Sequence, residues 1–322
     1  MRSLVTSTFR SQRLDAAQVA FLLRELEELD KTLYEDLLPG VLGMIYVPLQ
    51  QGVAEWQDVY TYKMWTKRGG TVNPGSRNAD NLKRASATMT PTSRRIEQFP
   101  LSYGWTVREI QQAAATGVPL DQVTVLAARS MAARSIDNFI ALGNIPEGGT
   151  DITGLYNNTD VAILSPQTKT GGTAWLTAGN LPDEVLNDIN YITEQLTSGL
   201  KQTDTPGFNK FTFLIPTAQY TYIATTPRSD LSDTTILRFA ITNNPWVESI
   251  EPWWQGDTAG ADSATRLVAY PRNPIAVSAL VPQEFRPLAP QERDLEIVVP
   301  ASAACGGTII RYAVACRYMD AI

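Results

Sequence analysis

The chain has 322 residues, of which 43% are hydrophobic and 19% are charged, and its formal net charge is −6. This hydrophobic content supports a folded core and argues against a disordered chain. The mild acidity argues against a generic nucleic-acid binder, whose affinity comes mostly from cations that neutralise phosphates. Histidine is absent, which removes the commonest general base and the commonest metal ligand.

Membrane insertion and secretion are not expected from this sequence. No run of eighteen apolar residues occurs, and the N-terminus lacks the apolar stretch of a signal peptide, so cytosolic synthesis is expected. Cys305 and Cys316 are the only cysteines. Without histidine they cannot complete a zinc site, and we expect two buried, unbonded thiols.

The N-terminal part should consist of an arm and a helix. Residues 1–15 are polar and irregular, which predicts an extended arm. From Val19 to Leu33, apolar residues recur at helical spacing, so a helix should begin at Asp15 and end at Pro39-Gly40. The apolar stretch 45–49 predicts a short strand.

The most informative segment follows at residues 55–105. Apolar residues alternate with polar ones before Thr66 and again after Arg95, which predicts two half-buried strands. Between them, only Val72, Leu82 and Met89 are large and apolar. We therefore predict a hairpin that cannot pack on its own subunit and packs on another copy instead. The alternating apolar residues are Trp56, Tyr60, Tyr62 and Met64, then Phe99, Leu101, Tyr103 and Trp105.

The charge of this hairpin is opposite to that of the rest of the chain. From Tyr60 to Arg108 there are nine basic residues against two acidic ones, Asp80 and Glu97. Since the whole chain is acidic, hairpin and body are complementary in charge. A basic loop that is merely solvated is the alternative interpretation.

Two helices are predicted after the hairpin. Thr106 and Glu109 have the spacing of a capping box for a helix over 106–117. Pro119 then starts a long, alanine-rich helix that ends near Leu142, which we call the spine helix. The glycines after it resemble a phosphate-binding loop, but Leu155-Tyr156 replaces the required Lys and Ser/Thr, so we exclude nucleotide binding.

The second half of the chain alternates helices and strands, which predicts an α/β lobe over 182–281. A loop over 164–181 precedes it, and strands at 295–299 and 308–318 should pair back near the spine helix. Within the lobe we expect helices at 182–200, 217–226 and 233–243, strands at 211–216, 245–252, 267–270 and 275–281, and a surface loop at 255–265.

No catalytic motif stands out, and we expect neither an enzyme nor a bound cofactor or metal. The acidic residues 25–30 fall around the polar face of a predicted helix, where solvated side chains are the simpler interpretation. Trp253-Trp254 could stack a sugar or a base, but their place at a strand exit fits an interface patch equally well.

The order of these parts resembles the major capsid protein of tailed bacteriophages, the Hong Kong 97-type fold that encapsulin shell proteins share. Local sequence is also similar, at Leu29–Glu35, Asp137–Gly143 and Thr153–Asn157. The resemblance implies an α+β fold with four parts. These are an N-terminal arm and helix over 1–49, an extended β-hairpin loop over 50–105, a peripheral domain over 106–181 with the long spine helix, completed by 282–322, and an α/β axial domain over 182–281.

The resemblance also implies that axial domains meet around five- and six-fold axes and that extended loops overlie neighbouring subunits. Some members cross-link their shells through Lys–Asn bonds, and Lys63, Lys67 and Lys83 lie in the corresponding region. The residues predicted to contact other subunits are Phe9, Arg10, Trp65, Lys67, Arg68, Arg77, Lys83, Arg84, Arg94, Arg95, Trp253 and Trp254.

The function predicted from this resemblance is a head protein that self-assembles, as pentamers and hexamers, into an icosahedral shell. The shell would enclose double-stranded DNA without sequence-specific binding, in a virion assembled in the host cytoplasm. Separate scaffolding, portal and decoration proteins are further expected partners. The alternatives are an encapsulin-type compartment with protein cargo, a soluble enzyme with an oligomerisation arm, and a phage tail or adaptor protein.

Overall fold

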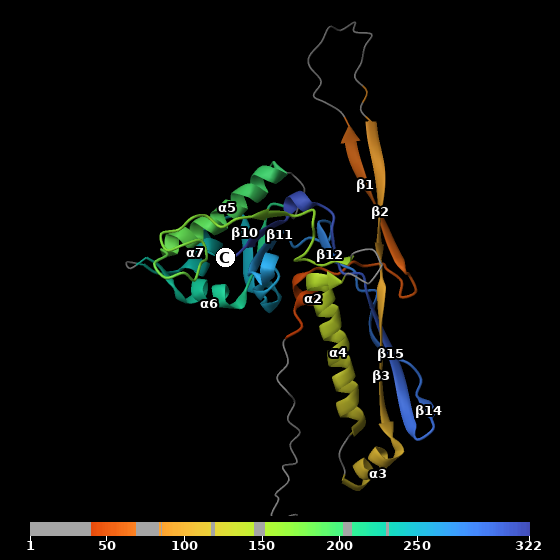
Figure 1. The fold of residues 1–322 in the computed structure, drawn as a ribbon. Helices are drawn as coiled ribbons and strands as arrows, with labels where there is room; N and C mark the ends of the chain where they lie inside the picture. The colour runs from red at the N-terminus through yellow and green to blue at the C-terminus, as the bar shows by residue number, and fades with distance from the viewer. Residues whose placement is uncertain are drawn as a thin grey trace, which may run out of the picture. The chain divides into compact units, whose positions relative to one another are not determined.

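The computed structural model describes residues 40–68, 84, 86–116, 120–144, 152–201, 208–229 and 232–322 (Figure 1). Residues Val41–Ile322 form one unit, and Met1–Gly40 form another. The arm and helix predicted before Gly40 lie outside the described residues. The following paragraphs concern the larger unit.

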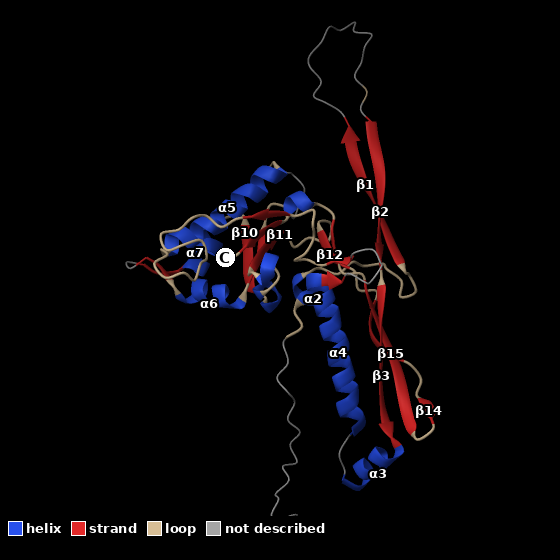
Figure 2. Ribbon diagram, in the orientation of Figure 1, coloured by secondary structure: helices blue, strands red, loops and turns tan. Residues whose placement is uncertain are grey.

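A five-stranded mixed sheet has the order β10-β7-β11-β17-β6. Figure 2 shows two of its strands, β10 and β11, beside α5, α6 and α7. The outer pairs β10–β7 and β17–β6 are parallel, whereas β11 is antiparallel to both β7 and β17. The strands are β6 (Ala162–Leu164), β7 (Phe211–Ile215), β10 (Val247–Pro252), β11 (Arg266–Tyr270) and β17 (Arg317–Asp320).

Both faces of this sheet are buried, so every residue of the central strands β7 and β11 is buried and most of these residues are apolar. Phe211, Phe213 and Ile215 of β7 lie in one core with the helices. Leu214, between them, lies in a second core together with Tyr318 of β17. Because alternate side chains of a strand point to opposite faces, one run of apolar residues serves two cores.

The first core is covered by three helices, α5 (Pro182–Leu200), α6 (Thr217–Thr225) and α7 (Ile236–Asn243). A short hairpin of β8 (Pro227–Ser229) and β9 (Ser232–Thr235) lies between α6 and α7. These elements confirm the three predicted helices, although the last begins at Ile236 because 232–235 is a strand. The predicted strand at 211–216 is confirmed as well.

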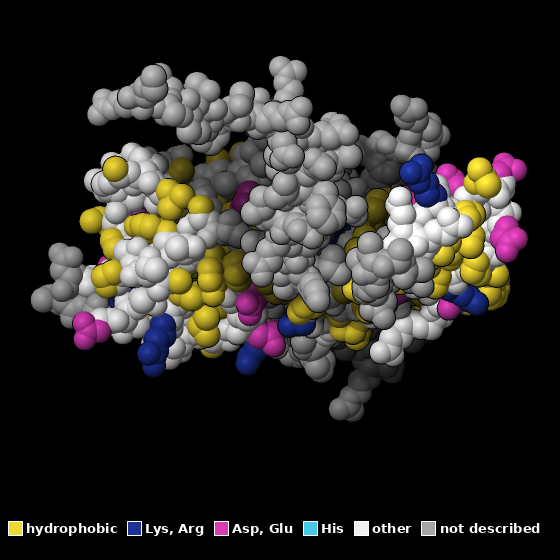
Figure 3. Space-filling model, turned by 90° about the horizontal axis from the view of Figure 1, so that it is seen from below, with side chains coloured by type: hydrophobic (Ala, Val, Ile, Leu, Met, Phe, Trp, Pro, Cys, Tyr) yellow, Lys and Arg dark blue, Asp and Glu magenta, His cyan; other side chains and the backbone are white. Residues whose placement is uncertain are grey.

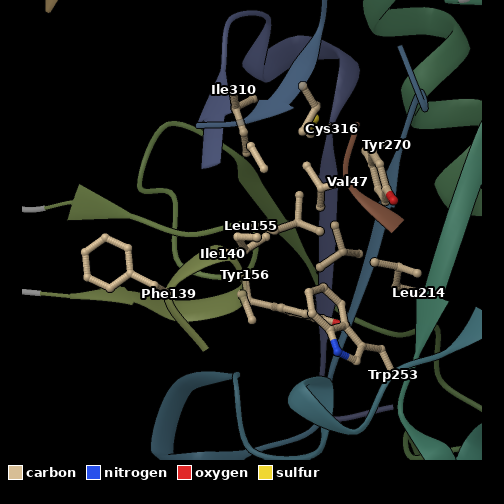
Figure 4. Packing of buried hydrophobic residues seen from close by; sticks show 14 of the residues in the cluster. Val47, Phe139, Ile140, Leu155, Tyr156, Leu214, Trp253, Tyr270, Ile310 and Cys316 are labelled. Carbon is tan, nitrogen blue, oxygen red and sulfur yellow. The ribbon is translucent and has the colours of Figure 1, made fainter. Parts of the chain in front are cut away.

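The second core is built on the predicted spine helix, α4 (Leu120–Leu142). Its C-terminal half is buried through Ile136, Phe139 and Ile140, and it packs with Val47 and Trp253, as Figure 4 shows. The helix ends at Gly143, whose φ of +69° and close approach to the Ile152 carbonyl leave no room for a side chain. The short strands β4 (Gly143–Asn144) and β5 (Ile152–Thr153) pair directly after it.

Beside α4 lies a sheet in which β15 (Glu296–Cys305) pairs with β3 (Glu97–Thr106) along its whole length. Phe99 of β3 stacks edge-on against Phe139 of α4, with 5.1 Å between ring centroids. The predicted pairing of 99–105 with 56–64 is therefore wrong, because this strand finds its partner near the C-terminus. The other strands of this region are β13 (Gln283–Pro287) and β14 (Gln291–Arg293), which also pair with β15, and the separate pair β12 (Val277–Ala279) and β16 (Thr308–Ile310).

Three further expectations need correction. The predicted strand at 45–49 is instead the single helical turn α2 (Gly43–Tyr46), followed by an isolated bridge from Leu49 to Ala279. The predicted surface loop 255–265 contains two 3₁₀ turns, η1 (Trp254–Asp257) and η2 (Ala261–Ser263), and its start is buried. Strands β6 and β17 belong to the sheet of the predicted axial domain, although both were assigned to the peripheral domain.

The helix α3 (Val107–Thr116) begins with the predicted capping box. The Glu109 carboxylate accepts the backbone N–H of Thr106 at 2.8 Å, and the Thr106 hydroxyl accepts the N–H of Glu109 at 3.2 Å. These hydrogen bonds from Thr106 hold the pKa of Glu109 below its ordinary value. The local spacing of Thr and Glu thus correctly located the helix start.

Both cysteines are buried and unbonded, as predicted. Burial raises the pKa of Cys305 and of Cys316 to about 12. At pH 8 this leaves about one thiol in ten thousand as the reactive thiolate. We expect no maleimide labelling of the native protein and labelling of both thiols in concentrated urea, measured by mass spectrometry. Rapid native labelling of either thiol would contradict this burial.

The carboxylate of Asp137 joins α4 to the start of α2. It accepts the backbone N–H groups of Leu42 at 2.9 Å and Gly43 at 2.5 Å, and the Gln255 amide at 3.4 Å. Burial raises the pKa of Asp137 above its ordinary value, and these hydrogen bonds only partly oppose the rise. A carboxyl with a raised folded-state pKa favours the folded state most at low pH, where it is protonated in both states.

The free energy of unfolding should therefore contain a contribution that falls as pH rises from the ordinary Asp pKa through the raised one. Asp137→Asn keeps an acceptor oxygen but does not titrate, so it should remove that contribution. We expect the stability difference between wild type and variant to change across this pH window, measured by urea unfolding. A difference that is constant from pH 4 to pH 7 would show that Asp137 does not titrate in this way.

Candidate inter-subunit surfaces

In place of the predicted pairing, β1 (Val59–Arg68) forms a two-stranded ribbon with β2 (Ser86–Arg95), a strand within the segment that was expected to be the loop. The strands are antiparallel over ten residue pairs, from Val59–Arg95 to Arg68–Ser86. Within the described part of the chain, neither strand pairs with a third. An isolated two-stranded ribbon is marginally stable in water, so this one needs another surface.

The side chains of the ribbon confirm that its own chain covers little of it. Every described residue of β2 except Arg94 is exposed. Trp65 is 66% exposed, although an indole of this size is usually an anchor in a core or an interface. Its cross-strand partner Met89 is 40% exposed, so the two form an apolar pair that is open to solvent.

The base of the ribbon is fixed to its own chain. Tyr60 and Tyr62 pack against a small core of Ile96, Leu280, Ala304 and Ile309. The Arg311 guanidinium lies over the Tyr62 ring, 5.2 Å from its centroid. The ribbon therefore has an anchored end at Tyr60–Tyr62 and an unanchored part beyond Lys63.

Two of the predicted contact residues serve this anchoring. The Arg94 guanidinium donates to the Thr153 hydroxyl at 3.0 Å, and Arg95 pairs with Glu97 at 2.8 Å. Both contacts are made within the chain. The predicted role of Arg94 and Arg95 in contacts between subunits is therefore not needed to explain where their side chains lie. Arg95 is more than half exposed, which limits the stabilising effect of its ion pair.

The other predicted contact residues divide into four groups. Trp65 and Arg84 are exposed, and Trp254 is 39% exposed. The prediction that Trp253 contacts another subunit is wrong, because its side chain is fully buried and packs edge-on against Tyr46. Lys67 and Arg68 lie in β1 by their register, whereas Phe9, Arg10, Arg77 and Lys83 lie outside the described residues.

Sequence reasoning missed a second surface, the turn between β14 and β15. Glu292, Asp294 and Glu296 are all exposed there, and Leu295 is 74% exposed. In the described ranges, none of these carboxylates is in an ion pair. Three acidic residues within five positions were the available sequence signal.

Metal binding and membrane insertion find no support in the described part of the chain. No group of three or more Cys, Asp or Glu residues within it could hold a metal ion. None of its helices is long and apolar enough to span a membrane.

The comparisons with known proteins agree on one kind of molecule. The family model described as "major capsid protein" matches residues 73–322. No curated protein matches the sequence.

Among solved structures, the capsid of Myoviridae phage XM1 is 18% identical in sequence and has a TM-score of 0.79. The match covers 93% of this chain and 98% of the phage chain. The capsid of the native GTA particle is 8% identical, with coverages of 95% and 99% and a TM-score of 0.65. The structure titled Mycobacterium phage Ogopogo is 12% identical, with coverages of 94% and 98% and a TM-score of 0.58. At these identities the likeness shows the fold, and it confirms the predicted capsid fold.

Proposed function

The chain belongs to the major capsid protein family, and on that premise we propose that its copies close into an icosahedral shell around the double-stranded DNA of a tailed bacteriophage. It is a structural protein that assembles with itself into a capsid shell. The pentamers and hexamers of that shell, its DNA content and its assembly in the host cytoplasm are parts of the proposal.

The observation that carries the proposal is the ribbon of β1 and β2, whose distal part its own chain leaves exposed. In a shell, each ribbon overlies a neighbouring copy. That copy buries Trp65 and Met89 and supplies the packing surface that the two-stranded ribbon lacks in its own chain. Each such contact can be weak, because a closed shell forms very many of them at once.

The negative net charge of the chain is compatible with DNA that the shell encloses without binding it tightly. With a net charge of −6, the subunit on the whole repels phosphate, and packed DNA does not adhere to the wall. The DNA is accordingly held without sequence-specific contacts. Separate scaffolding, portal and decoration proteins would complete the particle.

Negative-stain imaging of the purified protein, with nuclease-protected nucleic acid measured in the same fraction, tests this function. We expect closed, faceted shells, and DNA in particles from infected cells. Shells that contain a co-purifying protein instead of DNA would indicate an encapsulin-type compartment. Rings or tubes would indicate a tail or adaptor protein, and a monomer with turnover would indicate an enzyme.

A further inference from the structure

The two faces of the ribbon differ in how much their own chain covers them. Alternation along β1 and the register with β2 place Lys63, Trp65, Met89 and Pro91 on one face. We call it the Trp65 face. The opposite face starts with Tyr60 and Tyr62, which pack on the ribbon's own base.

The Trp65 face is the one left for another molecule. Trp65 and Met89 are directly opposite each other across the strands and form an apolar centre, and Lys63 lies exposed next to it. A surface that covers this face must offer apolar area for the Trp65–Met89 pair and negative charge for the lysine. Those two requirements select among the exposed apolar surfaces of the described chain.

One candidate acceptor, the exposed stripe of α4, fails the charge requirement. Val123, Leu126 and Met131 are exposed along this helix. Arg129 is exposed on the same helix. A basic ribbon would meet like charge there, which is unfavourable.

The turn between β14 and β15 meets both requirements. Leu295 is among the most exposed large apolar residues. Glu292, Asp294 and Glu296 surround it in the sequence and outnumber the exposed cation between them, Arg293, whose guanidinium donates to the Gln291 side chain at 3.1 Å. Val107, 42% exposed, lies beside Leu295, because its backbone N–H donates to the Leu295 carbonyl at 3.0 Å. Figure 3 shows hydrophobic and acidic side chains, with some Lys and Arg side chains among them, at the right of the view, the side on which Figure 1 places β14.

We propose that the Trp65 face of one copy docks on the β14–β15 turn of a second copy. Trp65 and Met89 pack against Leu295 and Val107, and Lys63 lies among the three carboxylates. The proposal rests on the proposed shell function and names the surface that receives the ribbon. Because donor and acceptor are different patches, the contact is heterologous and passes from copy to copy, as a closed lattice requires.

A charge exchange tests the electrostatic half of the contact. Lys63→Glu and Asp294→Lys should each lower the yield of shells about tenfold or more, since each places like charges together. Both substitutions in the same chain should restore the yield to within about twofold, because the pair is re-formed with reversed sign. As the matched control, Lys63→Glu combined with Glu194→Lys, an exposed acid on α5, should not restore it. Normal yield of both single variants, or equal rescue by the control, would overturn the proposal.

A disulfide tests the geometry directly. Shells of the double variant Met89→Cys, Leu295→Cys should give a ladder of covalently linked subunits on a non-reducing gel, whereas each single variant should give monomers. The native thiols do not interfere, because both are buried. Shells that form without a ladder would overturn this docking surface and leave the shell function standing. A wild-type protein that forms no shells would instead overturn the function itself.

Discussion

A subunit with a shortened ribbon should fold like the wild type and fail to form shells. The variant replaces residues 65–89 with an Asn-Gly turn, which links Met64 to its cross-strand partner Thr90. Assembly is expected to fall below detection in negative-stain images, because every copy loses the Trp65–Met89 pair that its neighbour should bury.

Folding should survive this change because the described part of the removed segment lies in an exposed ribbon. The anchoring residues Tyr60 and Tyr62 remain, together with the small core under them. The midpoint of urea unfolding should therefore stay close to that of the wild type. A second variant, Thr88→Ser with Thr90→Ser, alters the opposite face of the same ribbon and should assemble normally. Shells at normal yield from the shortened variant would show that the ribbon does not act between copies.

The largest effect on stability is expected from Lys169→Met. Lys169 and Asp188 form an ion pair at 2.6 Å in which neither side chain is exposed. The Lys169 ammonium also donates to the carbonyls of Gln167 at 3.0 Å and Thr173 at 2.6 Å. The Asp188 carboxylate accepts the Trp175 indole N–H at 2.8 Å. This network holds the irregular segment 165–181 on α5.

Removal of the lysine leaves the Asp188 carboxylate buried without its counter-charge. Breaking one partner of a buried pair typically costs about 3–5 kcal/mol, so the free energy of unfolding should fall by about that amount. Lys169→Met with Asp188→Asn should recover part of the loss, because no uncompensated charge remains. As the control, Arg286→Met breaks the exposed pair with Glu55 and should cost about 0–1 kcal/mol. A loss below about 1 kcal/mol for Lys169→Met would mean that water reaches the carboxylate in the folded protein.

Much of the fold followed from local patterns in the sequence. The spacing of Thr106 and Glu109 located one helix start. The helix predicted over 182–200 is α5, and at its start the Glu184 carboxylate accepts the N–H of Leu181 at 2.8 Å. The loop over 164–181 was also expected, but its buried Lys169–Asp188 pair was not. An isolated lysine in a sequence is usually solvated, and only the three-dimensional packing reveals its partner.

The errors concern partners that are distant in the chain. Period-two alternation correctly identified 99–105 as a strand, yet nothing local indicates that it pairs with β15, almost two hundred residues later. Trp253 and Trp254 are adjacent and chemically identical, but one is fully buried and the other is 39% exposed. The acidic turn of β14 and β15 was overlooked because its meaning depends on Leu295 and Val107, which the fold brings together.

The most direct test of the account is a map of the assembled particle, by cryo-electron microscopy, at a resolution that traces the β1–β2 ribbon of each copy. We expect each ribbon to lie on an adjacent copy with the indole of Trp65 buried between the two. A protein that remains monomeric at high concentration, with Trp65 packed against its own subunit, would contradict the account.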